Sequence, residues 1–268
     1  MVVKRLNLIL IFLLIVSQSQ KLTGTQDYRW HSYAYSGYAW SRFAGFVNPD
    51  PITFQVDSIA GDDNVLRNVP FVGLALHRRL CAFLEFGFSY DSYAVFAYQK
   101  YHLISPSDAE GSIELLYPEY QRQFSLQHQA VMCESFLKFP EQFEVIAGNL
   151  LVYPVFGVAV GVGINNMMGF QTITYDFVSD TTDVTTIANN RIVKSLAWRF
   201  EFAINFASAN SNLDFGFSYR YEHGGKFASG QKYMLNDVIN QGSIYNLSAW
   251  TGVLKTHQLK LYINVNFD

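Results

Sequence analysis

The chain has 268 residues, half of them hydrophobic, and it carries 23 Phe and 17 Tyr. Its formal net charge of −3 argues against an extensive basic surface for nucleic acid. The mean hydropathy of +0.07 indicates that apolar and polar residues are finely mixed. Two cysteines, Cys81 and Cys133, provide no disulfide framework, and we expect two separate buried thiols rather than one bridge.

The first nineteen residues have the anatomy of a secretory signal peptide. Lys4 and Arg5 form a short basic start, an apolar run follows at 6–16, and small residues precede a cleavage site before Gln20. A membrane-spanning helix is the alternative, but this run is shorter than the roughly 20 residues that a bilayer requires. We therefore expect a signal peptide over 1–19, a periplasmic segment over 20–29 and one domain over 30–268.

Eight segments alternate large apolar residues with small or polar ones, which is the signature of a β-strand. In chain order they are 30–43, 71–77, 84–91, 124–139, 156–164, 196–206, 213–222 and 259–267. The first and fourth segments change phase, near 36–37 and 127–130, and the change at 36–37 is a natural site for a β-bulge.

The connections between these segments alternate in length. Long connections are expected at 45–68, 98–121, 165–190 and 227–255, and short ones at 78–81, 139–143 and 208–212. This alternation is typical of an up-and-down barrel with loops on one rim and tight turns on the other.

The two faces of the strands decide between a soluble and a membrane barrel. A soluble, lipocalin-like barrel would enclose about forty large apolar side chains, more than an eight-stranded interior can hold. The opposite face is rich in Gly, Ala and Ser, as at Gly157, Ala197 and Gly216, which suits a narrow lumen. The sequence therefore predicts an all-β, eight-stranded antiparallel transmembrane barrel with the large apolar face toward lipid. Aromatic residues that suit the membrane interfaces are Tyr90, Trp198, Tyr219 and Tyr221.

Charged residues on the small face must then point into the lumen. A Lys or Arg facing lipid at mid-bilayer would cost about 2–4 kcal/mol. In a narrow lumen, charges are tolerated when they are paired and hydrogen-bonded. We expect an ion-pair network that closes the barrel, with a gate or narrow permeation path as the alternative. Its predicted members are Glu85, Asp91, Arg199, Glu201, Asp214, Arg220, Glu222 and Lys260, and Glu134 is expected to join them.

The pattern resembles the small outer-membrane β-barrel proteins of Gram-negative bacteria, the group of OmpA-like membrane domains and opacity-type surface antigens. The most specific match is the closing strand LKLYINVNF, which is similar to the carboxy-terminal assembly signal of that group, with Asp268 following its final aromatic residue. The residues of this signal would be Leu259, Leu261, Ile263, Val265 and Phe267. The resemblance implies a location in the bacterial outer membrane, contact with lipid and lipopolysaccharide, insertion by the barrel assembly machinery, and a monomer.

Two functions fit this interpretation. The first is a structural or surface role, adhesive or antigen-like, in which the long loops meet a host or surface ligand. Aromatic residues in these connections would either contact that ligand or pack loop against loop; they are Tyr117, Tyr120, Tyr233 and Trp250. The second function is a narrow porin-like channel for small solutes or hydrophobic molecules. We expect no enzyme, no cofactor and no metal site, because no His stands in a suitable relation to an outward-facing Ser and no Cys/His spacing suits zinc.

Overall fold

The computed structural model describes nine stretches of the chain. The predicted signal peptide (1–19) and periplasmic segment (20–29) lie outside these stretches. The described residues are 30–47, 67–81, 83–102, 120–139, 141–176, 181–208, 211–235, 243–246 and 249–267. Among these residues, no helix is long and apolar enough to cross a membrane.

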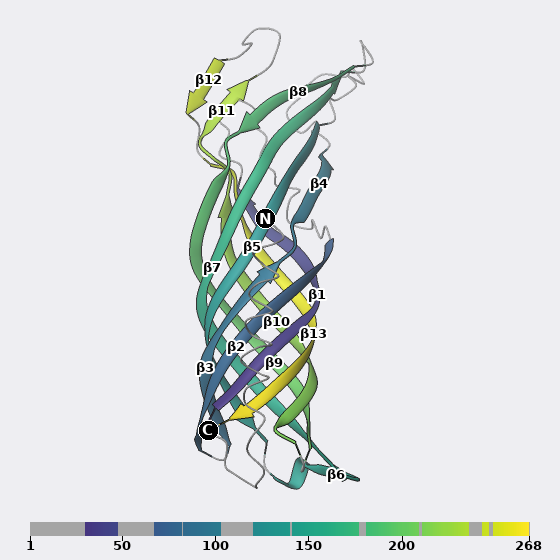
Figure 1. Cartoon of the computed structure of the whole chain (residues 1–268). Helices are drawn as coiled ribbons and strands as arrows, with labels where there is room; N and C mark the ends of the chain where they lie inside the picture. Colours follow the sequence, from purple (N-terminus) through teal and green to yellow (C-terminus); the bar gives the residue numbers. More distant parts are fainter. Residues whose placement is uncertain are drawn as a thin grey trace.

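Eight long antiparallel strands close into a barrel (Figure 1). Consecutive long strands pair with each other along the chain, and β5 with β7 is one of these pairs. The barrel closes because the first strand pairs with the last. The predicted fold class is confirmed: every predicted segment falls on one of these strands, and only Phe139 lies beyond a strand end. The strands are β1 (Trp30–Val47), β2 (Arg67–Cys81), β3 (Leu84–Tyr93), β5 (Tyr120–Lys138), β7 (Leu150–Asp176), β9 (Arg191–Ser208), β10 (Leu213–Ala228) and β13 (Thr251–Phe267).

At the long-connection rim the sheet continues beyond the barrel. Four short strands extend it: β4 (Phe96–His102), β8 (Thr181–Ala188), β11 (Lys232–Leu235) and β12 (Ser243–Asn246). β4 pairs with the upper part of β5, and β8, β11 and β12 continue in order from the upper part of β7 (Figure 1). Three segments expected as connections, 98–121, 165–190 and 227–255, are therefore partly strand. In β8, the β-branched Thr, Val and Ile residues favour extended backbone without an apolar face.

At the opposite rim the connections are short. The chain turns between Cys81 and Leu84, so the predicted turn 78–81 is instead the end of β2. The connection predicted at 139–143 is longer, because η2 (Glu141–Phe143) and the small strand β6 (Val145–Ala147) precede β7. β6 pairs back onto β7 through a turn with Gly148 at φ 65°, a conformation that glycine adopts readily.

The side chains alternate between the lumen and the outer face. Phe202 is 47% exposed on the outside, and its neighbour Ala203 is 2% exposed on the inside. The same alternation exposes Phe215, Phe217 and Leu261 on the outer face. The large apolar face thus surrounds the barrel, as the sequence predicts. Cys81 and Cys133 are both free, but Cys81 is exposed and Cys133 only half-buried, so the expectation that both thiols are buried was wrong.

The bulge predicted in β1 lies elsewhere. β1 pairs with β2 without a shift through Ser36 and Gly37, and its irregularity falls between Ala44 and Val47. β5 has its irregularity between Gln123 and Ser125 in its pairing with β7. The phase changes in the sequence have a different cause, which is that large apolar residues face the lumen in part of these strands.

Candidate functional site

The centre of the lumen holds one aspartate between two arginines. Asp91 of β3 forms an ion pair with Arg199 of β9, and its Oδ1 lies 3.2 Å from Nη1 of Arg220 on β10. All three side chains are at most 1% exposed. Strands that do not neighbour each other are therefore joined across the lumen.

On the short-turn side, Arg220 is held by a second carboxylate and an aromatic ring. Its Nε donates to Oε2 of Glu201 at 2.5 Å, and Glu201 also forms an ion pair with Lys260 of β13. The ring of Tyr35 lies 4.7 Å from both the Arg220 guanidinium and the Lys260 amine, as in a cation–π contact. Gly73 makes room for this ring, because a Cβ there would lie 2.1 Å from it.

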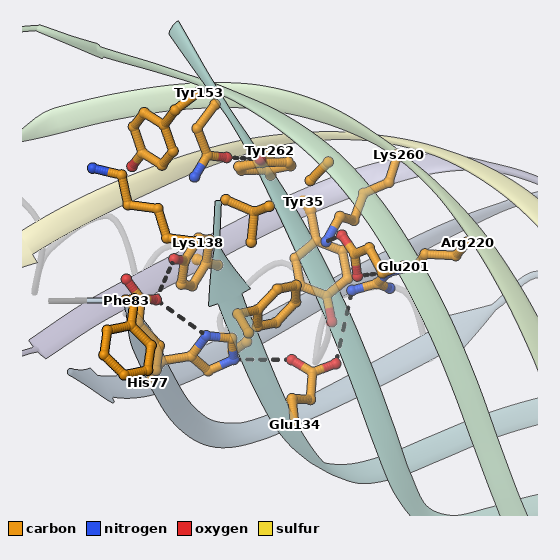
Figure 2. Close-up of a pocket in the computed structure, with 17 residues that line it drawn as sticks. Tyr35, His77, Phe83, Glu134, Lys138, Tyr153, Glu201, Arg220, Lys260 and Tyr262 are labelled. Atoms are coloured by element: carbon orange, nitrogen blue, oxygen red, sulfur yellow. Dashed lines mark hydrogen bonds and ion pairs between the residues drawn. The ribbon is translucent and has the colours of Figure 1, made fainter. Parts of the chain in front are cut away.

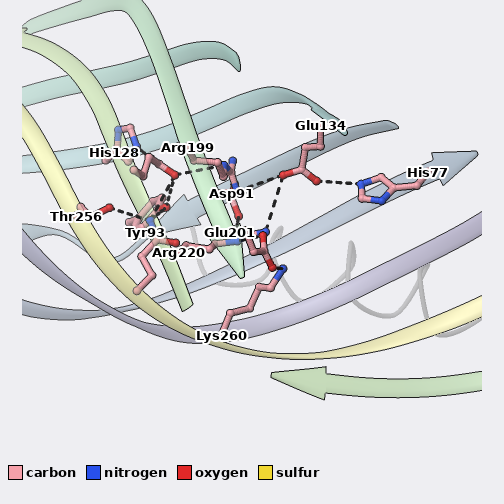
Figure 3. A network of polar contacts seen from close by, with 12 residues as sticks. His77, Asp91, Tyr93, His128, Glu134, Arg199, Glu201, Arg220, Thr256 and Lys260 are labelled. Atoms are coloured by element: carbon pink, nitrogen blue, oxygen red, sulfur yellow. Dashed lines mark hydrogen bonds and ion pairs between the residues drawn. The ribbon is translucent and has the colours of Figure 1, made fainter. Parts of the chain in front are cut away.

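A histidine connects this centre to the short-turn rim (Figure 3). Nε2 of His77 lies 2.9 Å from Oε2 of Glu134, whose Oε1 is 3.4 Å from Arg199. Nδ1 of His77 is 3.9 Å from Glu85, and Glu85 accepts a hydrogen bond from Tyr33 at 3.0 Å. Polar contacts thus extend from the middle of the barrel toward its short-turn rim.

A second histidine extends the network toward the long-connection side. Glu222 lies 3.6 Å from Nε of Arg199, accepts a hydrogen bond from Tyr93 at 3.1 Å, and is 2.8 Å from Nε2 of His128. Nδ1 of His128 is in turn 2.8 Å from Oδ1 of Asn165. All the residues of this ion network occupy inward-facing strand positions, so their polar atoms meet in the lumen.

The predicted lumen residues occupy two regions. One group forms the ion network, consisting of Asp91, Glu134, Arg199, Glu201, Arg220, Glu222 and Lys260. Glu85 reaches this group through His77. Asp214 lies apart near the short-turn rim, where it accepts hydrogen bonds from Asn266 at 2.7 Å and Asn264 at 3.5 Å.

Sequence reasoning missed two histidines of the network. His77 could have been found, because it lies on the same face as Gly73 and Ala75 in the alternating pattern of β2. His128 was hidden by the phase change in its strand. The proposed assembly residues lie on β13 between β1 and β10, with Leu259, Leu261 and Ile263 exposed on the outside, Phe267 partly exposed and Val265 buried.

A second layer closes the lumen above the ion network. We call it the aromatic plug, and its members are Phe43, Phe96, Tyr98, Phe124, Leu126, Met167, Phe170, Phe227, Trp250 and Leu254, all at most 4% exposed. The rings of Tyr98 and Phe124 are stacked at 4.5 Å, and Phe124 meets Trp250 at 5.4 Å.

The aromatic plug depends on an irregularity in β10. The pairing of β10 with β9 stops at His223, but its pairing with β13 continues to Ala228 past a shift between His223 and Gly225. Gly225 has φ 83°, which only glycine adopts without strain. Beyond it, Phe227 is fully buried in the aromatic plug.

The predicted loop aromatics can be placed only in part. Trp250 is 1% exposed, so it packs inside the barrel mouth and is not free for a ligand. Tyr117 lies outside the described residues, and Tyr120 and Tyr233 lie in strands with their side chains outside the description.

A small cavity lies between the ion network and the short-turn rim (Figure 2). Polar residues of its wall include Tyr33, His77, Glu134, Glu201 and Lys260. The volume inside it that the centre of a water molecule can occupy is about 20 Å³, enough for one or two waters. This cavity therefore has room for nothing larger than water.

Solved structures of small membrane barrels are similar to this chain. Neisserial surface protein A is 12% identical over 89% of this chain and 97% of its own, with a TM-score of 0.42. Ail, the attachment invasion locus protein of Yersinia pestis, is 13% identical over 88% and 99%, with a TM-score of 0.31. Outer membrane protein AlkL is 11% identical over 92% and 94%, with a TM-score of 0.38. No family model matches the chain, and no curated protein matches it in sequence.

The strand pairing, rather than these low similarities, defines the fold. A closed antiparallel barrel leaves no unpaired edge, and its apolar outer face is compatible with lipid. The chain thus has the fold of a small membrane-spanning β-barrel, with short turns at one rim and long connections at the other.

Proposed function

We propose that the protein is a monomeric outer-membrane barrel with a sealed lumen, whose outer rim serves a surface role such as adhesion or antigen display. The observation that carries this proposal is the double closure, since the aromatic plug covers an ion network that is itself almost fully buried. In this role the outer face contacts lipid and lipopolysaccharide, and β13 carries the segment read by the barrel assembly machinery during insertion.

The extended sheet supports a display role. β5 and β7 continue past the barrel and carry β4 and β8, so the outer connections begin from hydrogen-bonded strands. Recognition residues commonly lie on loops held by such a rigid base.

Protease accessibility tests this orientation. A recognition site for a specific protease is inserted between Asp176 and Thr181 in one variant and between Ser208 and Ser211 in another. We expect the protease added to intact cells to cut only the first variant, and both after the outer membrane is permeabilised. Cleavage of the second variant alone on intact cells would reverse the orientation and contradict surface display.

A narrow channel is the second candidate, and the cavity below the ion network favours it. This cavity reaches from the short-turn side to Glu201 and Arg220, so a rearrangement of the network could extend it. In planar bilayers we expect the wild-type barrel to give no steady openings. Reproducible openings that disappear on Arg199→Ala or Glu201→Gln would support the channel and contradict the sealed lumen.

A further inference from the structure

We propose that the outer face of β9, β10, β13 and β1 binds the phosphate groups of an outer-leaflet glycolipid of the lipopolysaccharide type. This inference rests on the outer-membrane function proposed above and assigns its lipopolysaccharide contact to a defined site. The site is a basic row, which we define as Arg42, Lys255 and His223, three outward residues on adjacent strands.

The basic row places two like charges opposite each other, with a histidine beside them. Arg42 of β1 is the direct partner of Lys255 on β13, and Lys255 is the direct partner of His223 on β10. Opposed residues in antiparallel strands have Cβ atoms about 5 Å apart, and like charges at that spacing repel. Lys194 and Lys226 are further exposed cations of β9 and β10 at the same end of the barrel.

No carboxylate within the described residues compensates this row. The four strands contain three acidic residues, Glu201, Asp214 and Glu222, and all three are buried on the lumen side. No ion pair joins Arg42 or Lys255 to any described carboxylate. Within the described residues the row therefore has no counter-charge, and an anion that lies between opposed cations would relieve their repulsion.

Aromatic side chains below the row indicate its depth in the membrane. The next outward positions toward the short-turn rim are Trp40, His257 and Tyr221 on the same three strands, and His257 is held by a 2.6 Å hydrogen bond with Tyr219. Beside His223, the ring of Trp198 is stacked at 5.4 Å. Tyr and Trp rings of this kind mark the boundary between acyl chains and headgroups.

The length of β13 agrees with that depth. From Phe267 at the short-turn rim to Lys255, the strand climbs about 30 Å at a rise of about 3.3 Å per residue and a tilt of about 40°. This height is close to the thickness of the apolar layer, so the basic row lies at the outer-leaflet headgroups. Guanidinium and ammonium groups recognise phosphate there.

Among the described side chains, the basic row has no counterpart on the opposite side of the barrel. Across the wall, the outward residues at the matching end of β5 and β7 are the neutral amides Gln127, Gln129 and Asn166. Among the described side chains the cations therefore gather on one side, which favours one bound lipid at a specific place.

Glycolipid binding by the purified barrel tests this inference. The full chain is refolded into vesicles of zwitterionic lipid, and the affinity for added lipopolysaccharide is compared with that for the same material after enzymatic removal of its phosphates. We expect the Arg42→Gln/Lys255→Gln double variant to bind the phosphorylated glycolipid about thirtyfold more weakly, since each cation near a membrane surface contributes about a factor of five. The dephosphorylated glycolipid should bind wild type and double variant equally weakly.

Controls separate the site from other causes. Arg78→Gln removes an exposed cation of β2 at the periplasmic rim and should leave binding unchanged. Inorganic phosphate at millimolar concentration should not compete, because the lipid anchor supplies the local concentration. Gel mobility of the unheated barrel verifies folding, and Lys255→Gln alone should weaken binding about fivefold. Equal affinity of double variant and wild type, or of both glycolipids, would refute the site, whereas surface display is decided independently by the protease experiment.

Discussion

Arg220→Leu is expected to lower the free energy of unfolding by about 3–5 kcal/mol, because it leaves buried carboxylates without their partner. Arg220 is fully buried and lies within 3.2 Å of both Glu201 and Asp91. The cation–π contact with Tyr35 is lost as well.

Urea unfolding of the barrel in lipid vesicles, followed by gel mobility of unheated samples, measures this loss. Arg220→Lys keeps the charge but not the fork of donors, so its loss should be intermediate. Arg78→Leu, at an exposed position, should change stability by no more than about 0.5 kcal/mol. A loss below about 1 kcal/mol for Arg220→Leu would show that the ion network does not stabilise the barrel.

Phe202→Arg is expected to block membrane assembly, whereas Ala203→Ser is expected to be tolerated. Phe202 faces lipid near the middle of β9, where an Arg would cost about 2–4 kcal/mol. Ala203 faces the lumen and lines the cavity, so a serine hydroxyl there meets polar neighbours. The fraction of each variant recovered in the outer membrane as folded barrel measures the difference. Similar recovery of both would contradict the orientation of the strand faces.

The strands could be predicted from the sequence because the lipid-facing side of the barrel has one simple pattern. The exceptions lie where the lumen is apolar too. In β5, Phe124 and Leu126 face inward and Val131 and Leu137 outward, so the apolar phase changes although the pairing of β5 with β7 is unbroken from Ser125 to Lys138. Apolar periodicity shows which side of a strand contacts an apolar environment. Where apolar side chains fill the lumen, both the lipid-facing and the lumen-facing side of the strand are apolar, and the alternation is lost.

The contacts of the ion network could be predicted only in part. Alternation alone places Asp91 and Arg199 on the inner face, but their strands are not neighbours, and their contact depends on the stagger of the whole barrel. The same stagger separates Asp214 from the arginines and brings it to Asn266. The sequences of β8 and β11 show no alternation of apolar and polar residues, so periodicity could not predict these strands.

The pairing of β1 with β13 has a consequence for how the molecule forms. It joins residues 235 positions apart, as His31 and Asn266 are at 2.5 Å. Because the entropy of ring formation grows only with the logarithm of chain length, this seam costs about 3–4 kcal/mol more than a tight hairpin of the same register. Once β1 and β13 have paired, the hydrogen bonds between them, from the pair Trp30–Phe267 to the pair Val47–Thr251, offset that difference. The obstacle is kinetic: until the last strand arrives, two sheet edges stay open, so a chain cut short before Thr251 should remain a substrate for chaperones and proteases.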